Sequence, residues 1–270
     1  MSNSAEKGSS GFSLLRGGLV ALLLMAFLSG CVRTYEGRGE VRVDEAVQNR
    51  VAAAMEYLQM GQPREARQHL TRALALDNRS VIAHNAMALV YQFEGDDKNE
   101  EHHYRQALRA DRHFSPARNN YGTLLFRQER YSEALRQFKR AAADSAYGGR
   151  GIAYENMGRC YLAMDQREDA RAAFNRALRL NPDAVRPLLE LADIHFQDGQ
   201  TRAAVNYYQQ YISRGIEQNA RTLWLGIRIA AAAGDGDSQA SYELALRQRF
   251  PGSREYRAWR QWRGEHGSSS

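Results

Sequence analysis

Apolar side chains recur along this chain at helical spacing, in a pattern that repeats. Ala73, Ala107 and Ala141 occupy equivalent places, so the pattern advances by 34 residues from 73 to 107 to 141, and Ala177 follows after 36. Within each step apolar residues fall three or four apart, which places them on one face of a helix. A fixed period of this length indicates similar stacked units. We therefore expect an all-α chain of about six helix-turn-helix units.

Small and large residues repeat in register with those alanines. Small residues where two helices cross let them approach closely, and large apolar residues one turn away fill the space beside them. The small positions of the first helices are Ala54, Ala88, Gly122, Gly158 and Ala192. In the second helices a small residue is followed four positions later by a large one, in the pairs Ala66 and Leu70, Ala134 and Phe138, Ala170 and Phe174, and Ala204 and Tyr208. This pattern resembles the tetratricopeptide repeat, which implies a right-handed superhelix.

The repeat predicts the organisation of the molecule. We expect the array to cover residues 47–250, in units near 47–80, 81–114, 115–148, 151–184, 185–218 and 219–250. Residues 251–270 are expected to form a C-terminal cap and a disordered tail. One unit departs from the pattern, because Glu100 takes a small-residue position within the polar stretch "GDDKNEEHHYRQAL". We therefore expect the second helix of that unit to be looser or shifted.

Residues 1–30 have the composition of an export signal. The first residues, through Arg16, are mostly small and polar, and residues 19–28 then form an uncharged apolar run. This run is shorter than the roughly 20 residues that cross a bilayer, but it suits the apolar region of a secretory signal. We therefore interpret this segment as a signal peptide.

The four residues "LSGC" at positions 28–31 resemble the lipobox of bacterial lipoproteins, in which the cysteine is acylated and the preceding segment is removed. The resemblance implies that Cys31 is lipidated and that residues 31–46 form a flexible tether. Val32, in place of an aspartate, implies sorting to the outer membrane, with the protein on its periplasmic face. The alternative is an uncleaved signal that contains a cysteine by chance.

The net charge of +6 raises nucleic acid or anionic lipid as possible partners. The cations are scattered over helix faces instead of gathered in blocks, and an exported protein meets little nucleic acid. We expect no nucleic-acid partner, and at most a mild attraction to anionic surfaces.

Few residues suggest catalytic chemistry. His102 and His103 lie near Glu100, Glu101 and His113, but adjacent residues on a helix point about 100 degrees apart, which disfavours binding one metal ion. We interpret these side chains as a solvated helix face. His195 and Cys160 are interpreted as packing residues. We expect no catalytic residue, no metal, no cofactor and no small-molecule substrate, and hence not an enzyme.

The resemblance to tetratricopeptide repeats implies a concave groove lined by the first helices of the units. The groove positions of the first three units that we single out are Val51, Met55, Leu58, Ile82, Asn85, Leu89, Phe93, Asn119 and Phe126. We expect the apolar residues to hold side chains of an extended or helical peptide, and Asn85 and Asn119 to pair with its backbone. Some of these residues could instead pack against the tether or a neighbouring helix. The later groove is more polar, with Glu155, Arg159, Asp193 and Gln197.

Four stretches are more specific than the repeat alone. They are "AHNAMALVYQ" (83–92), "YRQALRADRHFSPARNNYGTLLFRQERYSEA" (104–134), "YENMGRCYL" (154–162) and "FPGSREY" (250–256). Together they resemble the type IV pilus biogenesis and stability lipoproteins. The resemblance implies an outer-membrane pilotin that binds the pilus secretin and promotes its localisation and oligomerisation.

Other classes of function remain possible. The protein could be a general envelope scaffold that recruits peptidoglycan enzymes or assists the assembly of outer-membrane proteins. A metal-dependent enzyme using His102, His103 and His113 and a helical-repeat RNA binder are weaker alternatives. The export signal disfavours the RNA binder.

Overall fold

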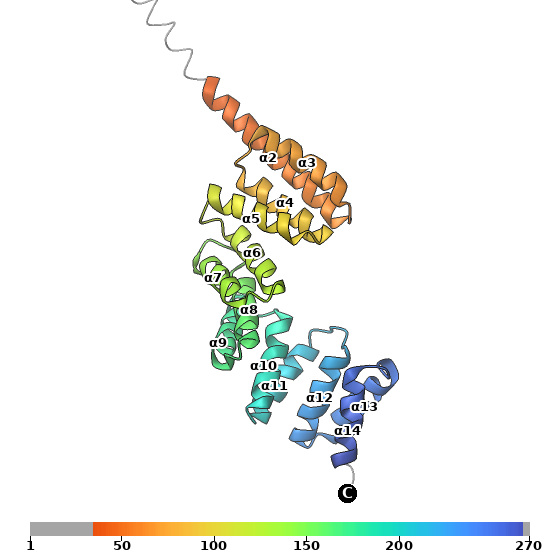
Figure 1. The fold of residues 1–270 in the computed structure, drawn as a ribbon. Helices are drawn as coiled ribbons and strands as arrows, with labels where there is room; N and C mark the ends of the chain where they lie inside the picture. Colours follow the sequence, from red (N-terminus) through yellow and green to blue (C-terminus); the bar gives the residue numbers. More distant parts are fainter. Residues whose placement is uncertain (1–34, 267–270) are drawn as a thin grey trace, which may run out of the picture. The chain divides into compact units, whose positions relative to one another are not determined.

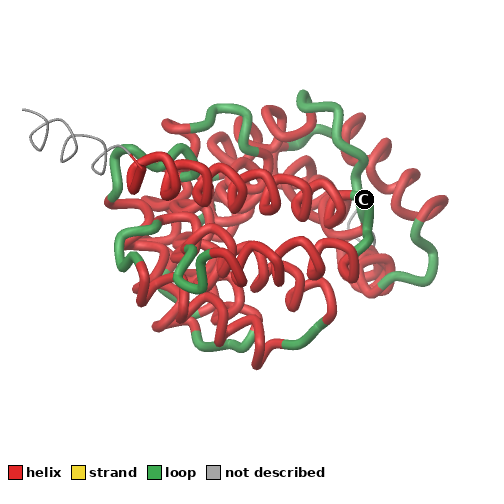
Figure 2. The backbone as a smooth tube through the Cα atoms, turned by 90° about the horizontal axis from the view of Figure 1, so that it is seen from above, coloured by secondary structure: helices red, strands yellow, loops and turns green. Residues whose placement is uncertain are grey.

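The computed structural model describes residues 35–266, and this part of the molecule is entirely helical apart from its connecting loops (Figures 1 and 2). The predicted all-α tetratricopeptide fold is confirmed. Successive helices pair as α2 (Tyr35–Gln59) with α3 (Pro63–Leu76), α6 (Ser115–Arg127) with α7 (Tyr131–Ala143), α8 (Arg150–Ala163) with α9 (Arg167–Leu180), α10 (Val185–Gln197) with α11 (Thr201–Ile212), and α12 (Ala220–Ala233) with α13 (Gly236–Arg249). Helix α4 (Val81–Glu94) packs against α2 and α3, and α5 (Asp97–Ala110) packs against α6. A last helix, α14 (Arg254–His266), follows.

The described residues divide into two compact bodies. The N-terminal body ends at Asp96 and contains α2, α3 and α4, and the C-terminal body begins at Asp97 and contains the helices from α5 onward. The boundary falls inside the second predicted unit, the one in which Glu100 replaces a small residue. The irregular sequence of that unit thus coincides with the point at which the molecule divides.

Helix α2 begins earlier than the sequence predicts. The segment through residue 46 was expected to be a flexible tether, but the backbone is helical from Tyr35. Val47 is buried together with Ala73 and Ala83, so one face of the helix is packed at this point. No proline lies between Tyr35 and Gln59, and a helix that is already nucleated extends at little cost. Residues 1–34, with the signal peptide and Cys31, lie outside the described residues, as do residues 267–270 of the predicted tail.

Within a hairpin the two helices touch at a small residue. The Phe138 ring lies so close to Gly122 that an added Cβ would sit 2.6 Å from it, and the Phe174 ring lies likewise against Gly158, at 2.5 Å. In the first hairpin the equivalent residues are Ala54 and Leu70, both fully buried. Alanine is larger than glycine, and its partner leucine is smaller than phenylalanine. Each pair therefore fills the space between the two helices, as close packing requires.

Helix α14 covers the end of the last hairpin. The Trp259 side chain is buried with Leu223, Ile227 and Leu246 of α12 and α13. An exposed apolar face at the end of a repeat array needs such a cover. No helix between residues 35 and 266 is both long and apolar enough to cross a membrane.

The close approach in the fourth hairpin leads to a stability prediction. Gly158→Val should lower the free energy of unfolding by about 2 kcal/mol, because its side chain would overlap the buried Phe174 ring. Thermal unfolding followed by circular dichroism measures the change. Gly264→Val is the matched control, since the site lies in α14 with no atom near the added side chain. Equal stability of the two variants would contradict the packing account.

Candidate protein-interaction surface

The predicted groove residues of α2 lie on the N-terminal body, and their side chains are only partly exposed. Val51, Met55 and Leu58 pack against the buried cluster that contains Leu70 and Val90. Each side chain therefore supports the hairpin on one side and faces solvent on the other. Helix α4 packs against α2, so the predicted residues of both helices belong to the same body.

Helix α4 contributes the most exposed apolar residue of the predicted set. Ile82, Asn85 and Leu89 are half-buried, whereas Phe93 is 57% exposed. The Phe93 ring lies over Gly61, in the turn that follows α2, and the neighbouring Met60 is 67% exposed. Met60 was not predicted, because it lies in a turn outside the helical groove positions. Phe93 and Met60 form an exposed apolar surface, which we call the Met60/Phe93 surface.

The two predicted groove residues of the C-terminal body are largely covered. Asn119 is only 7% exposed, and its side-chain oxygen accepts a hydrogen bond of 3.3 Å from Nδ2 of Asn156. The Phe126 ring is covered on one face by the guanidinium of Arg159, which lies 4.4 Å from the ring centroid. Asn119 therefore links α6 to α8, and the expectation that it is open to a peptide backbone is corrected.

The later first helices, α8, α10 and α12, present paired charges. Arg186 Nη1 lies 3.0 Å from the Glu155 carboxylate, and Arg221 Nη2 lies 2.9 Å from that of Glu190. Burial raises the pKa of Glu155 above its usual range. The predicted polar character of this region is thus present, but most of the charges already have partners.

Helix α12 adds two residues that sequence reasoning missed. The guanidinium of Arg228 lies 5.0 Å from the ring centroid of Phe196 and 5.3 Å from that of Trp224. Burial lowers the pKa of Arg228. The sequence contains no signal for this arrangement, because the sixth unit is degenerate and its groove positions cannot be assigned by register.

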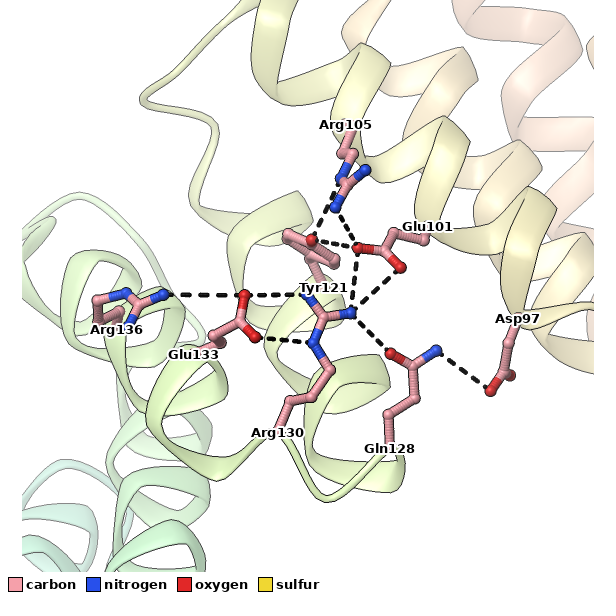
Figure 3. A network of polar contacts seen from close by, with 8 residues as sticks. All are labelled: Asp97, Glu101, Arg105, Tyr121, Gln128, Arg130, Glu133 and Arg136. Carbon is pink, nitrogen blue, oxygen red and sulfur yellow. Dashed lines mark hydrogen bonds and ion pairs between the residues drawn. The ribbon is translucent and has the colours of Figure 1, made fainter.

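A polar network fixes α5 to the rest of the C-terminal body (Figure 3). The Glu101 carboxylate accepts a hydrogen bond of 2.7 Å from the Tyr121 hydroxyl and pairs with Arg130 at 3.2 Å. Arg130 Nε also donates to Glu133, at 2.8 Å, and this bond lowers the pKa of Glu133. Helices α5, α6 and α7 are therefore joined through charged groups.

Glu100 is the unusual member of this region because its side chain is fully buried. Arg127 Nη2 donates a hydrogen bond of 2.6 Å to one carboxylate oxygen, and the other oxygen has no partner among the described residues. Burial raises the pKa of Glu100, and the bond with Arg127 opposes the rise only in part. Helix α5 has Glu100, Tyr104 and Ala107 on its buried face, and the expectation that it is looser or shifted stays a prediction.

The candidate metal cluster is not assembled. The His102 and His103 rings are 5.2 Å apart and nearly perpendicular, while the carboxylates of Glu100 and Glu101 are bonded to arginines. No group of three or more potential ligands that could hold a metal ion occurs among residues 35–266. Cys160 is fully buried, and burial raises the pKa of its thiol to about 12.

Comparisons with known proteins agree with this architecture. Profiles of the tetratricopeptide repeat match residues 51–92, 115–183, 156–212 and 189–254. The type IV pilus assembly protein PilF of Pseudomonas aeruginosa is 38% identical over 250 residues, which are 90% of this chain and 96% of that protein. A solved structure of Pseudomonas aeruginosa PilF is 36% identical, with a TM-score of 0.79, over 81% of this chain and 98% of the other. The crystal structure of PilW, a widely conserved type IV pilus biogenesis factor, is 31% identical, with a TM-score of 0.69, over 78% of this chain and 97% of the other.

The helical hairpins and these matches define a tetratricopeptide-repeat protein, a class that acts through protein-protein interactions. Within that class, the chain belongs to the family of the pilus proteins PilF and PilW. The family resemblance expected from the sequence is confirmed.

The buried carboxylate of Glu100 makes stability depend on pH. The pKa of Glu100 is higher in the folded state than in the unfolded state, so protonation of this side chain favours folding. Its contribution to the free energy of unfolding is lost as pH rises from the unfolded-state pKa through the folded-state pKa. The stability of the wild type relative to Glu100→Gln should therefore fall as pH rises above about 4.3. Urea unfolding at a series of pH values measures this difference.

Glu133→Gln is the control for that experiment and should show the opposite slope. The pKa of Glu133 is lowered by its bond to Arg130, so its contribution is present above the ordinary pKa and lost as pH falls. A relative stability of Glu100→Gln that does not change with pH would contradict the burial of an ionisable carboxylate at this site.

The thiol of Cys160 should be inert in the native protein. A buried thiol with a raised pKa forms little thiolate, which is the reactive species. We expect a full-length Cys31→Ser variant to show no reaction with a disulfide reagent at about pH 8 until urea unfolds it, when one thiol reacts. Rapid labelling without denaturant would contradict the packing of α8.

Proposed function

We propose that this protein is a pilotin-type assembly factor of the type IV pilus, which binds the pilus secretin and promotes its localisation and oligomerisation at the outer membrane. The observation that supports this most is the identity of 38% with PilF over 90% of the sequence. Fold similarity alone would be a weak argument, since unrelated functions share one fold.

The N-terminal body is the proposed binding site for a secretin segment. Its first helices offer half-buried apolar residues, and the Met60/Phe93 surface leaves two large apolar side chains in solvent. An apolar strip of this kind suits a peptide that inserts apolar side chains between the helices.

The lipid anchor is the second part of the proposal. Acylation of Cys31 would hold the protein at the membrane, because each buried CH2 of an acyl group contributes about 0.8 kcal/mol. A secretin subunit bound to an anchored protein is kept at a high local concentration near the membrane. Assembly of the ring would then proceed where the subunits are held.

Capture of the secretin tests the proposed site. Phe93→Glu should reduce capture from detergent-solubilised envelopes by at least about tenfold, since it places a charge within an apolar contact. Leu244→Glu is the matched control, because Leu244 is an exposed apolar residue of α13 in the C-terminal body, at 45% exposure. Circular dichroism confirms that both variants are folded. A Leu58→Glu, Leu89→Glu double variant tests the half-buried part of the same surface.

The outcomes separate the competing functions. Equal capture by the wild type and Phe93→Glu would remove the N-terminal body as the site. Capture of peptidoglycan enzymes or other outer-membrane proteins by the wild type, without the secretin, would favour the envelope scaffold.

A further inference from the structure

A cavity of about 690 Å³ lies in the C-terminal body, where the turn before α6 meets the end of α7. Its lining contains three arginines and few acidic groups. The polar lining residues are Arg112, His113, Ser115, Arg118, Arg140 and Asp144. Four of these lie in the stretch "RHFSPAR" (112–118), part of a segment that the repeat pattern does not explain.

Arg118 is the buried arginine of this cavity, whereas Arg112 and Arg140 are exposed. Arg118 lies on α6, four residues before Gly122. At the equivalent position, four residues before the small residue, α8 has Tyr154 and α10 has Leu188. Arg118 is only 9% exposed, and no carboxylate forms an ion pair with it among the described residues. A buried charge without a counter-ion is costly, so this choice of residue needs a reason.

The hydrogen bonds of Arg118 use only some of its N–H donors. Its Nη1 donates to Gln137 Oε1 at 2.9 Å, and its Nη2 donates to the backbone oxygen of Arg112. In α4, His84 holds the equivalent position and bonds the oxygen of Asn78, also six residues earlier. A neutral ring is therefore enough to fix the preceding turn. A guanidinium has five N–H donors, and the two hydrogen bonds of Arg118 use only two of them.

The acidic groups around the cavity are bonded to neutral donors. Asp144 accepts a hydrogen bond of 2.7 Å from the Ser115 hydroxyl, and Asp111 accepts one of 2.7 Å from the backbone N–H of His113. The Ser115 hydrogen bond lowers the pKa of Asp144, which therefore remains ionised. The charged residues that line the cavity are Arg112, Arg118, Arg140 and Asp144, so guanidinium groups outnumber carboxylates in the lining.

We propose that this cavity binds the side-chain carboxylate of an acidic residue presented by a partner protein. Guanidinium groups bind carboxylates through paired, charge-assisted hydrogen bonds. The first turn of α6 adds the positive end of a helix with no side-chain cap. This site is separate in sequence and chemistry from the apolar surface of the N-terminal body.

Fluorescence anisotropy with a labelled tetraglutamate peptide, amidated at its C-terminus, tests the site on the full-length protein. The wild type should bind this peptide and not a tetraglutamine peptide amidated in the same way. Arg140→Gln, a change at an exposed residue, should weaken binding by about tenfold, the loss expected for one charge-assisted bond. Arg118→Gln should abolish binding, and circular dichroism shows whether that variant still folds.

Arg202→Gln is the matched control, because Arg202 is exposed on α11 outside the cavity and its replacement removes the same charge. Binding should be unchanged in this variant. An equal loss of peptide affinity in Arg202→Gln and Arg140→Gln would mean that the net charge of the protein, and not this cavity, causes the binding. That result would overturn the proposal. Equal binding of the two peptides would also overturn it. A third outcome would also overturn the proposal: the protein binds phosphatidylglycerol vesicles in a way that depends on Arg140, and it does not bind tetraglutamate. The cavity would then be a lipid-binding site.

Discussion

The close approach of two helices at a small residue is the constraint on which each regular hairpin depends. Where Gly122 and Gly158 leave room, a phenylalanine ring fills it, and where alanine stands in the first hairpin, a leucine does so. Each hairpin buries little by itself, so the apolar faces must stack on neighbours. The partly exposed first helices that result are also the surfaces available to a partner. In the N-terminal body, the residues that stabilise the hairpin are thus also those of the proposed binding site.

Helix α5 is the exception, and it shows what happens when this constraint is broken. With Glu100 at a small-residue position, the helix is held by ion pairs with Arg127 and by the network around Glu101. Burial of a carboxylate costs free energy, and its pairing with an arginine offsets this cost only in part. The division of the molecule between Asp96 and Asp97 falls beside this helix.

The sequence predicts the fold well because the repeat is redundant. Several small and large positions recur in register, so one departure such as Glu100 does not hide the period. The early start of α2 could not be predicted, since the segment before Val47 lacks the repeat pattern and its helix is extended from a packed neighbour. The burial of Asn119 and the arginine cavity depend on contacts between residues more than twenty positions apart, such as Asn119 with Asn156 and Ser115 with Asp144. Periodicity locates helices, but it does not determine which polar side chains find partners.

In the proposed function, the protein assists assembly of the secretin ring. The most direct measurement is the amount of secretin multimer in outer-membrane fractions of a strain from which the gene is deleted, compared with the same strain complemented by the full-length protein. The account predicts that multimers are lost in the deletion strain, that subunits accumulate away from the outer membrane, and that the full-length protein restores the ring. Normal amounts of multimer at the outer membrane of the deletion strain would contradict it.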